Sequence, residues 1–317
     1  MPTLLICSAS DDLGDLHTLF REEAARRFSG VPGLQVRLWP DMPDPADVEA
    51  VAGWYPPAGL MHSLPNLRLA SSIAAGVDHV LGPAQPRPGV PVCRIVDPGL
   101  AAGMAEYVLW AVLYYHRALD QAQQQQQQRV WKMPVQKAAH QTHVGLMGLG
   151  ALGSHLAPML RAQGFVVSGW SRSAHAIEGV TTYAGPEALE RFVQAPDVLV
   201  CLLPLTDATR GLLNQALFAL MRPGAALVHC GRGEHLVVDD LLQALDQGHL
   251  RGAVLDVFAT EPLPASSPLW THPRVVVTPH MASGARPEVI VGQILDNLQR
   301  VRAGQPALHT VDRGAGY

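Results

Sequence analysis

The sequence has little cysteine, no long apolar run and no strong excess of charge of either sign. Its four cysteines are scattered over 317 residues without a CxxC pair, which excludes a disulfide-rich scaffold. No apolar stretch reaches the roughly 18 residues that a membrane-spanning helix needs. A formal net charge of −4 provides no basic footprint for nucleic acid. These absences leave an ordinary globular protein, in which local arginines would have to hold any anionic ligand.

The beginning of the chain also lacks the features of a signal peptide. The segment MPTLLICSASDDLGD has no basic region before its short apolar run, and it turns acidic after that run. It resembles a first strand. Three of the four cysteines lie in apolar runs, where we expect buried free thiols. Without targeting signals, we expect a cytoplasmic protein with reduced thiols.

The order of apolar segments predicts an α/β protein with two domains. A chain of 317 residues exceeds what one hydrophobic core usually supports. Short β-type runs alternate with helix-type segments, which is typical of parallel sheets built from βαβ units. Strands are expected at 3–8, 34–39, 50–54 and 67–73, and helices around 16–28 and from 99 to about 128. The last helix ends in a glutamine run, 123–128, to which we assign no chemistry.

A second strand–helix series begins at Thr142 and is clearer than the first. Strands are expected in THVGLMG, FVVSGW, DVLVCLLP, AALVHC, RGAVLDVF and RVVVTP. A final helix is expected from Pro287 to about Arg302, because its apolar residues recur at helical spacing. We expect this helix to return to the first domain.

A GxGxxG pattern follows the first strand of this second series and opens a helical pattern. That context is the one a dinucleotide-binding loop requires. The first glycine permits a tight turn, the second lets the backbone approach the pyrophosphate, and the third lets helix and strand pack closely. The helix N-terminus then faces the phosphates. The predicted loop consists of Gly148, Gly150, Ala151, Leu152 and Gly153.

The end of the next strand indicates which nicotinamide cofactor binds. An NAD-selective site places Asp or Glu there, to accept hydrogen bonds from the ribose 2′-hydroxyl. This sequence has Trp170-Ser171-Arg172-Ser173 instead. No acid is present to repel a 2′-phosphate, and Arg172 can pair with one. We therefore predict NADPH, with weaker use of NADH, and assign Arg172 and Ser173 to the cofactor site.

Three ionisable residues follow the last three strands of the series. Arg232 comes after AALVHCG, Glu261 after GAVLDVF and His280 after RVVVTP. In open α/β sheets ligands bind beyond the carboxyl ends of the strands, so these side chains should share one crevice. Arg232 can bind a carboxylate and a carbonyl oxygen in a fixed fork. His280 can protonate a developing alkoxide, and Glu261 would keep the imidazole charged and oriented.

In these residues and in the segments around them, the chain resembles the D-isomer-specific 2-hydroxyacid dehydrogenases, in particular their glyoxylate/hydroxypyruvate reductase A branch. The resemblance covers nearly the whole chain. It rests on SSIAAGVDHV (71–80), VDPGLAAGMAEYVLW (96–110), GLMGLGALGSHLA (145–157), GWSRS (169–173), LLPLTDATRGLLN (202–214), GRGEHLVVDDLLQAL (231–245), LDVFATEPLPASSPLW (255–270), VTPHMASGARP (277–287) and VDRGAGY (311–317).

The resemblance implies a fold with two Rossmann-like or flavodoxin-like domains. Residues 1–98 and 287–317 would form a flavodoxin-like substrate domain, into which a dinucleotide-binding Rossmann domain, 99–286, is inserted. The helix that begins at residue 99 would help to form a homodimer. Two departures, at Gly231 and at 281–284, remove no catalytic group but would reshape the substrate pocket.

The resemblance also implies roles for individual residues. Arg232, Glu261 and His280 would be the catalytic residues, and Arg232 and His280 would also contact the substrate. Ala75 and Gly76 would offer backbone N–H groups to its carboxylate. Further residues of the substrate and cofactor sites would be Trp54, Leu203, Pro204, Cys230 and Asp256, the last of which would contact the nicotinamide carboxamide. The other histidines show no metal-ligand spacing, so we expect no metal.

These observations predict an oxidoreductase that reduces a small 2-oxo acid, glyoxylate or hydroxypyruvate, with NADPH. Hydride transfer would be accompanied by proton donation from His280. Three alternatives remain open at this point. The chain could be an NAD-dependent dehydrogenase of a larger 2-hydroxy acid, a nucleotide-sensing interaction protein similar to the C-terminal-binding-protein corepressors, or a homologue that only binds the cofactor. No nucleic-acid or membrane partner is expected.

Overall fold

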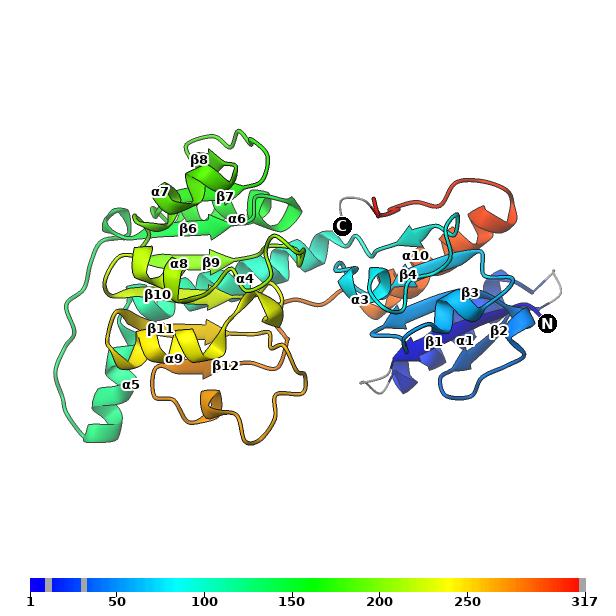
Figure 1. The fold of residues 1–317 in the computed structure, drawn as a ribbon, viewed down its shortest axis with the longest axis horizontal. Coiled ribbons are helices and arrows are strands. Elements are labelled where there is room, and N and C mark those ends of the chain that lie inside the picture. The colour runs from blue at the N-terminus through cyan, green and yellow to red at the C-terminus, as the bar shows by residue number, and fades with distance from the viewer. Residues whose placement is uncertain (9–12, 30–32, 314–317) are drawn as a thin grey trace. The chain divides into compact units, whose positions relative to one another are not determined.

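The computed structural model describes residues 1–8, 13–29 and 33–313, and it divides the chain into two compact units. Unit 1 comprises residues 1–100 and 284–317, and unit 2 comprises residues 101–283 (Figure 1). Each unit contains one sheet of parallel strands, so the predicted α/β class is confirmed. Within the described ranges no helix is both long and apolar enough to cross a membrane. The last four residues of the VDRGAGY motif lie outside the described residues.

Unit 1 is built on a five-stranded sheet with the order β2-β1-β3-β4-β5. Side chains on both faces of β1 and β3 are buried, as a parallel sheet covered by helices requires. Its strands are β1 (Thr3–Ser8), β2 (Gln35–Leu38), β3 (Val48–Trp54), β4 (Leu69–Ser72) and β5 (Val92–Cys93). We did not predict β5, whose two residues are too few to form a pattern.

Helices cover both faces of this sheet. On one face Phe20 of α1 (Gly14–Arg27) packs in the same core as Ile294 of α10 (Pro287–Arg302). The other face packs against α2 (Leu60–Ser63) and α3 (Asp78–Leu81). The expected late helix is therefore present, and it returns to the unit formed by the beginning of the chain (Figure 1).

Unit 2 is built on a seven-stranded sheet with the order β12-β11-β10-β9-β6-β7-β8. The chain adds β7 and β8 on one side of β6 and then returns to add β9 on the other side. A ligand site is expected beyond the carboxyl ends of the strands at such a reversal. The strands are β6 (His143–Met147), β7 (Val166–Ser171), β8 (Thr181–Ala184), β9 (Val198–Cys201), β10 (Ala225–His229), β11 (Leu250–Leu255) and β12 (Val275–Val277).

Two hydrophobic cores lie on opposite faces of the second sheet. One face packs against α4 (Pro98–His116) and α6 (Ala151–Ala162). The other packs against α7 (Leu189–Val193), α8 (Gln215–Leu220) and α9 (Val238–Asp246). Short 3₁₀ helices occur at Pro45–Asp47, Ala139–Gln141, Pro186–Ala188, Gly233–His235 and Pro268–Trp270.

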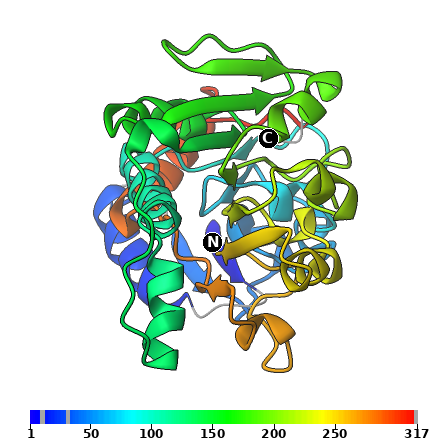
Figure 2. The same cartoon turned by 90° about the vertical axis from the view of Figure 1, so that its left-hand side faces the viewer.

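The prediction of one long helix from 99 to about 128 is wrong. The segment forms α4 and a separate helix, α5 (Leu119–Gln128), which turns away from the axis of α4 (Figures 1 and 2). Ala118 between them has a left-handed backbone with φ of +55°. Alanine is a strong helix former, so the local sequence does not mark this break. Tertiary contacts decide it, because Asp120 at the start of α5 forms a double hydrogen bond with Arg251 of β11.

The strand β8 was also missed. Its sequence TTYA is short and half polar, and it lies at the edge of the sheet. It pairs in parallel with β7, where Trp170 lies opposite Tyr183. A strand at the edge of a sheet is less buried than a central strand and needs fewer apolar residues. The apolar sequence pattern of β8 is therefore weaker than that of the central strands.

Candidate active site

The glycine-rich loop joins β6 to α6 and has the close packing that its sequence predicts. Gly148 has a φ of +109°, a conformation that favours glycine. A Cβ on Gly153 would lie 1.9 Å from the carbonyl oxygen of Gly148. The first turn of α6 can therefore approach β6 this closely only because residue 153 is glycine.

The second glycine of the loop borders open space. A Cβ on Gly150 would meet no heavy atom within 4 Å. Gly150 is the N-cap of α6, and Ala151 and Leu152 begin its first turn. Backbone N–H groups in a first helical turn have no partner inside the helix and favour an anion. The loop therefore fits the diphosphate of a dinucleotide, with open space where a side chain would otherwise stand.

The carboxyl end of β7 fits the 2′-phosphate on the ribose of NADPH. β7 ends at Ser171, whose hydroxyl donates a hydrogen bond to the carbonyl oxygen of Ser173 at 2.8 Å. This bond shapes the turn that carries Arg172, and the side chains of Arg172 and Ser173 are exposed. No acidic residue stands between 170 and 177. An anionic 2′-phosphate would thus meet a guanidinium and a hydroxyl here.

The three predicted catalytic residues follow three neighbouring strands. Arg232 follows β10, Glu261 follows β11 and His280 follows β12. The Nδ1 atom of His280 lies 2.8 Å from Oε2 of Glu261, and the two side chains are 26% and 28% exposed. The other carboxylate oxygen of Glu261 accepts a hydrogen bond from the Phe258 amide at 2.8 Å. The loop after β11 therefore aims Glu261 at the histidine.

The surroundings of Glu261 keep it ionised. Its burial by itself raises the pKa, but hydrogen bonds from His280 and from the Phe258 amide lower it. The positive charges of His280 and Arg232 lower it further, so the pKa of Glu261 lies below its ordinary value. At neutral pH the carboxylate can hold a proton on Nδ1 of His280. The second ring nitrogen, Nε2, is then left to exchange a proton with a substrate.

Asp256 holds the turn that carries His280. Its carboxylate accepts hydrogen bonds from the Thr278 hydroxyl at 2.6 Å and from the amides of Met281 and Ala282, both at 2.9 Å. Its backbone carbonyl accepts from the His280 amide at 2.9 Å. His280 has a φ of +50°, which is rare outside glycine and has to be held by its surroundings. A carboxylate has further lone pairs, so contact of Asp256 with the nicotinamide stays a prediction.

Sequence reasoning missed the residues that support this turn. The Tyr107 hydroxyl of α4 lies 2.6 Å from the Thr278 hydroxyl, which in turn donates to Asp256. The only local signal was the position of Thr278 two residues before His280. Tyr107 comes from a distant helix, and nothing in the sequence connects it to the site.

Two buried histidines hold the backbone of Arg232. The Arg232 amide donates a hydrogen bond to Nδ1 of His235 at 3.0 Å. The Arg232 carbonyl oxygen lies 2.8 Å from Nε2 of His229. The other nitrogen of the His235 ring lies 3.2 Å from the carbonyl oxygen of Pro204. Both rings are inaccessible to solvent, so they fix the main chain from which the arginine side chain extends.

The remaining predicted cofactor residues lie at the same ends of the strands. Leu203 and Pro204 follow β9, where Leu203 is buried and Pro204 is exposed. Cys230 follows β10 and is buried. Together with the loop after β6, they belong to the carboxyl edge of the sheet at its reversal point. Contact with the cofactor stays a prediction for these three residues.

The substrate residues expected from the resemblance are in unit 1. Trp54 ends β3, and its ring packs edge-on against His79 with centroids 4.6 Å apart. Ala75 and Gly76 follow β4, and the Gly76 carbonyl accepts a hydrogen bond from the Ser72 hydroxyl at 2.7 Å. Trp54 therefore lies at the carboxyl end of a unit 1 strand, and Ala75 and Gly76 lie just past the end of the next one. Their contact with a substrate stays a prediction.

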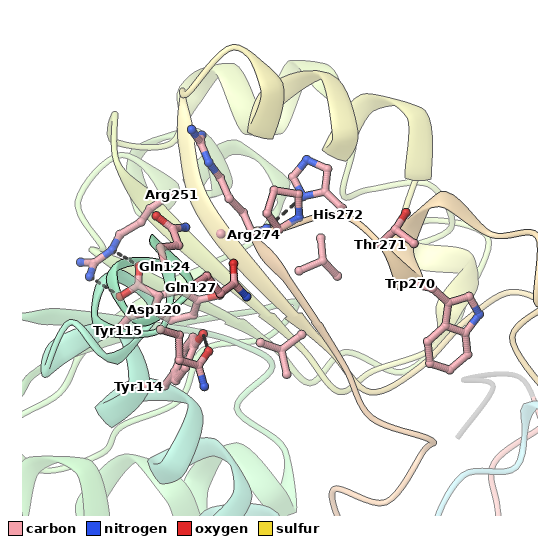
Figure 3. Close-up of a pocket in the computed structure, with 15 residues that line it drawn as sticks. Tyr114, Tyr115, Asp120, Gln124, Gln127, Arg251, Trp270, Thr271, His272 and Arg274 are labelled. Atoms are coloured by element: carbon pink, nitrogen blue, oxygen red, sulfur yellow. Dashed lines mark hydrogen bonds and ion pairs between the residues drawn. The ribbon is translucent and has the colours of Figure 1, made fainter. Parts of the chain in front are cut away.

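A cavity of about 270 Å³ in unit 2 is distinct from this site. Figure 3 shows residues of α4, α5, β11 and the segment before β12 around it, including the ion pair of Asp120 and Arg251. It is lined by no residue of the predicted cofactor or substrate sites. The catalytic chemistry therefore does not belong to this cavity.

The glycine loop and the strand-end trio define a dehydrogenase built on a dinucleotide-binding sheet. Residues 109–282 match the NAD-binding domain of the D-isomer specific 2-hydroxyacid dehydrogenases. The chain is 43% identical to the glyoxylate/hydroxypyruvate reductase A of Serratia proteamaculans, over 90% of this chain and 93% of the relative. The chain therefore belongs to the D-isomer-specific 2-hydroxyacid dehydrogenase family.

Solved structures agree with this assignment. A D-isomer specific 2-hydroxyacid dehydrogenase family protein from Klebsiella pneumoniae is 43% identical and superposes with a TM-score of 0.91, over 99% of this chain and 98% of its own. The NADPH-dependent glyoxylate/hydroxypyruvate reductase of Sinorhizobium meliloti, solved with NADP and sulfate, is 34% identical with a TM-score of 0.87 over 100% of both chains. The predicted family and two-domain fold are confirmed.

Proposed function

We propose that this chain reduces a small 2-oxo acid, glyoxylate or hydroxypyruvate, to the 2-hydroxy acid with NADPH. The observation that carries the proposal is the hydrogen bond between His280 Nδ1 and Glu261, with Arg232 on the neighbouring strand end. An oriented imidazole beside a guanidinium suits the reduction of a carbonyl next to a carboxylate. The activity named for the Serratia and Sinorhizobium relatives supports the same substrate class.

In this mechanism Arg232 binds the substrate carboxylate and the carbonyl oxygen through its planar fork. His280 donates the Nε2 proton to that oxygen as negative charge develops on it. Glu261 keeps the imidazolium charged and holds its ring in one orientation. When bound, NADPH supplies the hydride that reduces C2. Ala75 and Gly76 would add backbone N–H groups for the carboxylate, and Trp54 would limit the size of the substrate.

We propose that NADPH is held by the glycine loop and by the end of β7. The open space at Gly150 takes the diphosphate, and Arg172 and Ser173 bind the 2′-phosphate. Cys230, Leu203 and Pro204 line the path of the cofactor along the carboxyl edge, and Asp256 contacts the nicotinamide amide. The NADP bound in the Sinorhizobium reductase supports this cofactor.

We further propose that two copies of this chain associate. Large apolar side chains are exposed on α4 and on the segment after α5, and exposed apolar surface of this kind often belongs to a protein–protein interface. They are Trp110, Leu113, Val130, Trp131, Met133 and Val135, of which Trp131 is fully exposed. A second copy would cover them. The four buried free cysteines agree with the cytoplasmic setting that we propose.

The function is tested by following NADPH oxidation with glyoxylate, hydroxypyruvate and pyruvate, and by repeating each assay with NADH. We expect the highest kcat/KM for glyoxylate or hydroxypyruvate with NADPH. Faster turnover of larger acids with NADH would favour the alternative dehydrogenase. Tight NADPH binding without turnover of any 2-oxo acid would overturn the proposal in favour of a sensor.

His280→Ala tests the role of the proton donor. We expect kcat to fall by about 10²–10⁴-fold, the usual contribution of general acid catalysis, with NADPH affinity close to that of the wild type. His62→Ala, at an exposed position in unit 1, is the matched control and should retain activity. Wild-type turnover by His280→Ala would exclude this histidine as the acid.

A further inference from the structure

Three side chains of types that bind metals lie close together next to Arg232. They belong to Cys201, His229 and His235. One ligand atom from each residue lies within 4.8 Å of the others, and all three residues are buried. Cys201 ends β9, His229 ends the neighbouring strand β10, and His235 ends the 3₁₀ helix that follows Arg232. Their separations along the chain show no metal-ligand spacing, because the sheet brings them together.

The hydrogen bonds of His229 leave one of its nitrogens available. Nε2 lies 2.8 Å from the Arg232 carbonyl oxygen, so it carries the ring proton. Nδ1 is then an unprotonated acceptor, and it is buried without a hydrogen-bond partner in the described part of the chain. Burial, together with the charges of His235 and Arg232, lowers the pKa of this histidine to about 3. A neutral imidazole with a buried, unshared lone pair is a ready metal ligand.

The other two side chains have defined states as well. Burial raises the pKa of the Cys201 thiol to about 12, although the Leu203 amide donates a hydrogen bond to its sulfur. Without a metal the thiol therefore keeps its proton. His235 accepts the Arg232 amide on Nδ1, and its Nε2 faces the Pro204 carbonyl oxygen. Its Nδ1 can ligate a metal only by giving up the Arg232 amide.

Charge and softness select the kind of ion that fits this cluster. One thiolate and two neutral imidazoles carry a single negative charge. A monovalent cation would neutralise it, whereas a divalent cation would leave a net charge buried, at a high cost in free energy. Thiolate is a soft ligand that suits both Cu⁺ and Zn²⁺, so the charge of the cluster is what favours Cu⁺. Bonds of about 2.3 Å to sulfur and 2.0 Å to nitrogen join ligand atoms at most about 4.3 Å apart. This span is close to the 4.8 Å within which the three ligand atoms lie.

We propose that Cys201, His229 and His235 form an inhibitory binding site for Cu⁺. The S–H bond of Cys201 breaks, its proton leaves to solvent and a Cu–S bond forms, while the imidazole nitrogens donate lone pairs. The copper enters and remains as Cu⁺, so no oxidant or reductant is needed. Because both ring nitrogens of His235 already have protein partners, a bond to copper withdraws the ring from the Arg232 amide or from the Pro204 carbonyl oxygen. Either change displaces the catalytic arginine or the cofactor segment. The inhibition, but not the binding, rests on the proposed reductase function.

Anaerobic titration with the Cu⁺ complex of bicinchoninate tests the site, because loss of the chelator colour reports transfer to the protein. We expect the wild type to take up a single Cu⁺ and Cys201→Ala to take up none. Cys93→Ala is the matched control, since Cys93 is also a buried free thiol whose pKa burial raises to about 12, but in unit 1. It should bind copper as the wild type does. Equal uptake by Cys201→Ala would overturn the proposal.

The ligands are identified by X-ray absorption of the bound copper, which should show one sulfur and imidazole nitrogens. A shell of sulfur alone would refute the cluster, because Cys230 also lies near enough to interact with Cys201. His229→Asn provides a second variant if Cys201→Ala does not fold. Its amide can still donate to the Arg232 carbonyl oxygen, but it removes the imidazole ligand, so we expect uptake at least 10-fold weaker. Uptake equal to that of the wild type would exclude His229.

The inhibitory effect is measured separately. Turnover of glyoxylate with NADPH should fall in proportion to the bound Cu⁺ and recover when a chelator removes it. Cys201→Ala should have basal turnover close to that of the wild type and should not respond. Full turnover with the site occupied would overturn the inhibition. Copper uptake needs no substrate, so a failure of the proposed function would leave the binding result intact.

Discussion

Single residues in the candidate site act through their hydrogen bonds as much as through their charge. Glu261 has one oxygen on His280 and the other on the Phe258 amide, so its carboxylate cannot turn away from the imidazole. The net effect of its surroundings is a lowered pKa, in spite of burial. Its ionised form therefore stabilises the fold above the ordinary carboxyl pKa, and this contribution is lost as the pH falls through the lowered value.

Glu261→Gln tests this coupling. Glutamine can still accept a hydrogen bond from Nδ1 but carries no charge to stabilise the imidazolium. Because the lowered pKa of Glu261 limits activity on the acid side, we expect the acid limb of the kcat/KM profile that comes from this carboxyl group to disappear. Turnover at neutral pH should fall by about 10- to 100-fold, or roughly 1.4–2.8 kcal/mol. A pH profile and a turnover that coincide with the wild type would show that the charge of Glu261 does not support catalysis.

Arg172→Asp tests the choice of cofactor. A carboxylate at the end of β7 would repel the 2′-phosphate and could accept hydrogen bonds from the 2′-hydroxyl of NADH. We expect the ratio of kcat/KM for NADPH to that for NADH to fall at least 10-fold. Arg21→Asp, on the exposed surface of α1, makes the same charge change in unit 1 and should leave the ratio unchanged. An unaltered ratio for Arg172→Asp would mean that another group reads the ribose.

At the scale of elements, the glycines at the junction of β6 and α6 have different functions. Gly153 is required for packing, because a Cβ there would overlap the Gly148 carbonyl oxygen. Gly150 is required for access, because a Cβ there would enter open space at the N-terminus of α6. Its φ of −69° is one that alanine also adopts. Gly153 therefore contributes to stability and Gly150 to cofactor binding, although the two residues are only three positions apart.

Two alanine variants test this separation. Gly153→Ala should lower the free energy of unfolding by about 1–3 kcal/mol or more, as overpacking does, and should weaken NADPH binding as a consequence. Gly150→Ala should unfold like the wild type in denaturant but bind NADPH at least 10-fold more weakly. Fluorescence titration of NADPH and equilibrium unfolding measure the two effects. Unchanged NADPH affinity in Gly150→Ala would place the diphosphate elsewhere.

At the scale of the whole molecule, the exposed apolar surface of α4 and of the segment after α5 predicts a dimer. We expect analytical ultracentrifugation to find the wild type as a dimer and Trp131→Glu/Met133→Glu as a monomer or a much weaker dimer. Charges placed on this surface would have to be desolvated in an interface. Leu308→Lys, at an exposed leucine of unit 1, is the control and should remain dimeric. A wild type that stays monomeric at micromolar concentration would exclude the assembly.

Much of the fold and of the candidate site could be predicted, because the sequence patterns that indicate them involve neighbouring residues. Buried parallel strands need apolar residues on both faces, and the segment around β6 shows this directly, followed by glycines whose spacing suits the loop. The type of each strand-end residue also indicates its chemistry, as with Arg232 and His280. The break at Ala118 and the short strands β5 and β8 carry no such local signal, so they were missed.

The sequence by itself therefore determined the α/β class, the dinucleotide loop and the identity of the candidate catalytic groups, because periodicity and residue type are properties of neighbouring residues. Only the tertiary structure decided how those groups are held. Tyr107, Asp256, His229 and His235 support the site through hydrogen bonds between segments that lie far apart in the chain. The cluster with Cys201 arises in the same way, since parallel strands bring their carboxyl ends together whatever their separation in sequence.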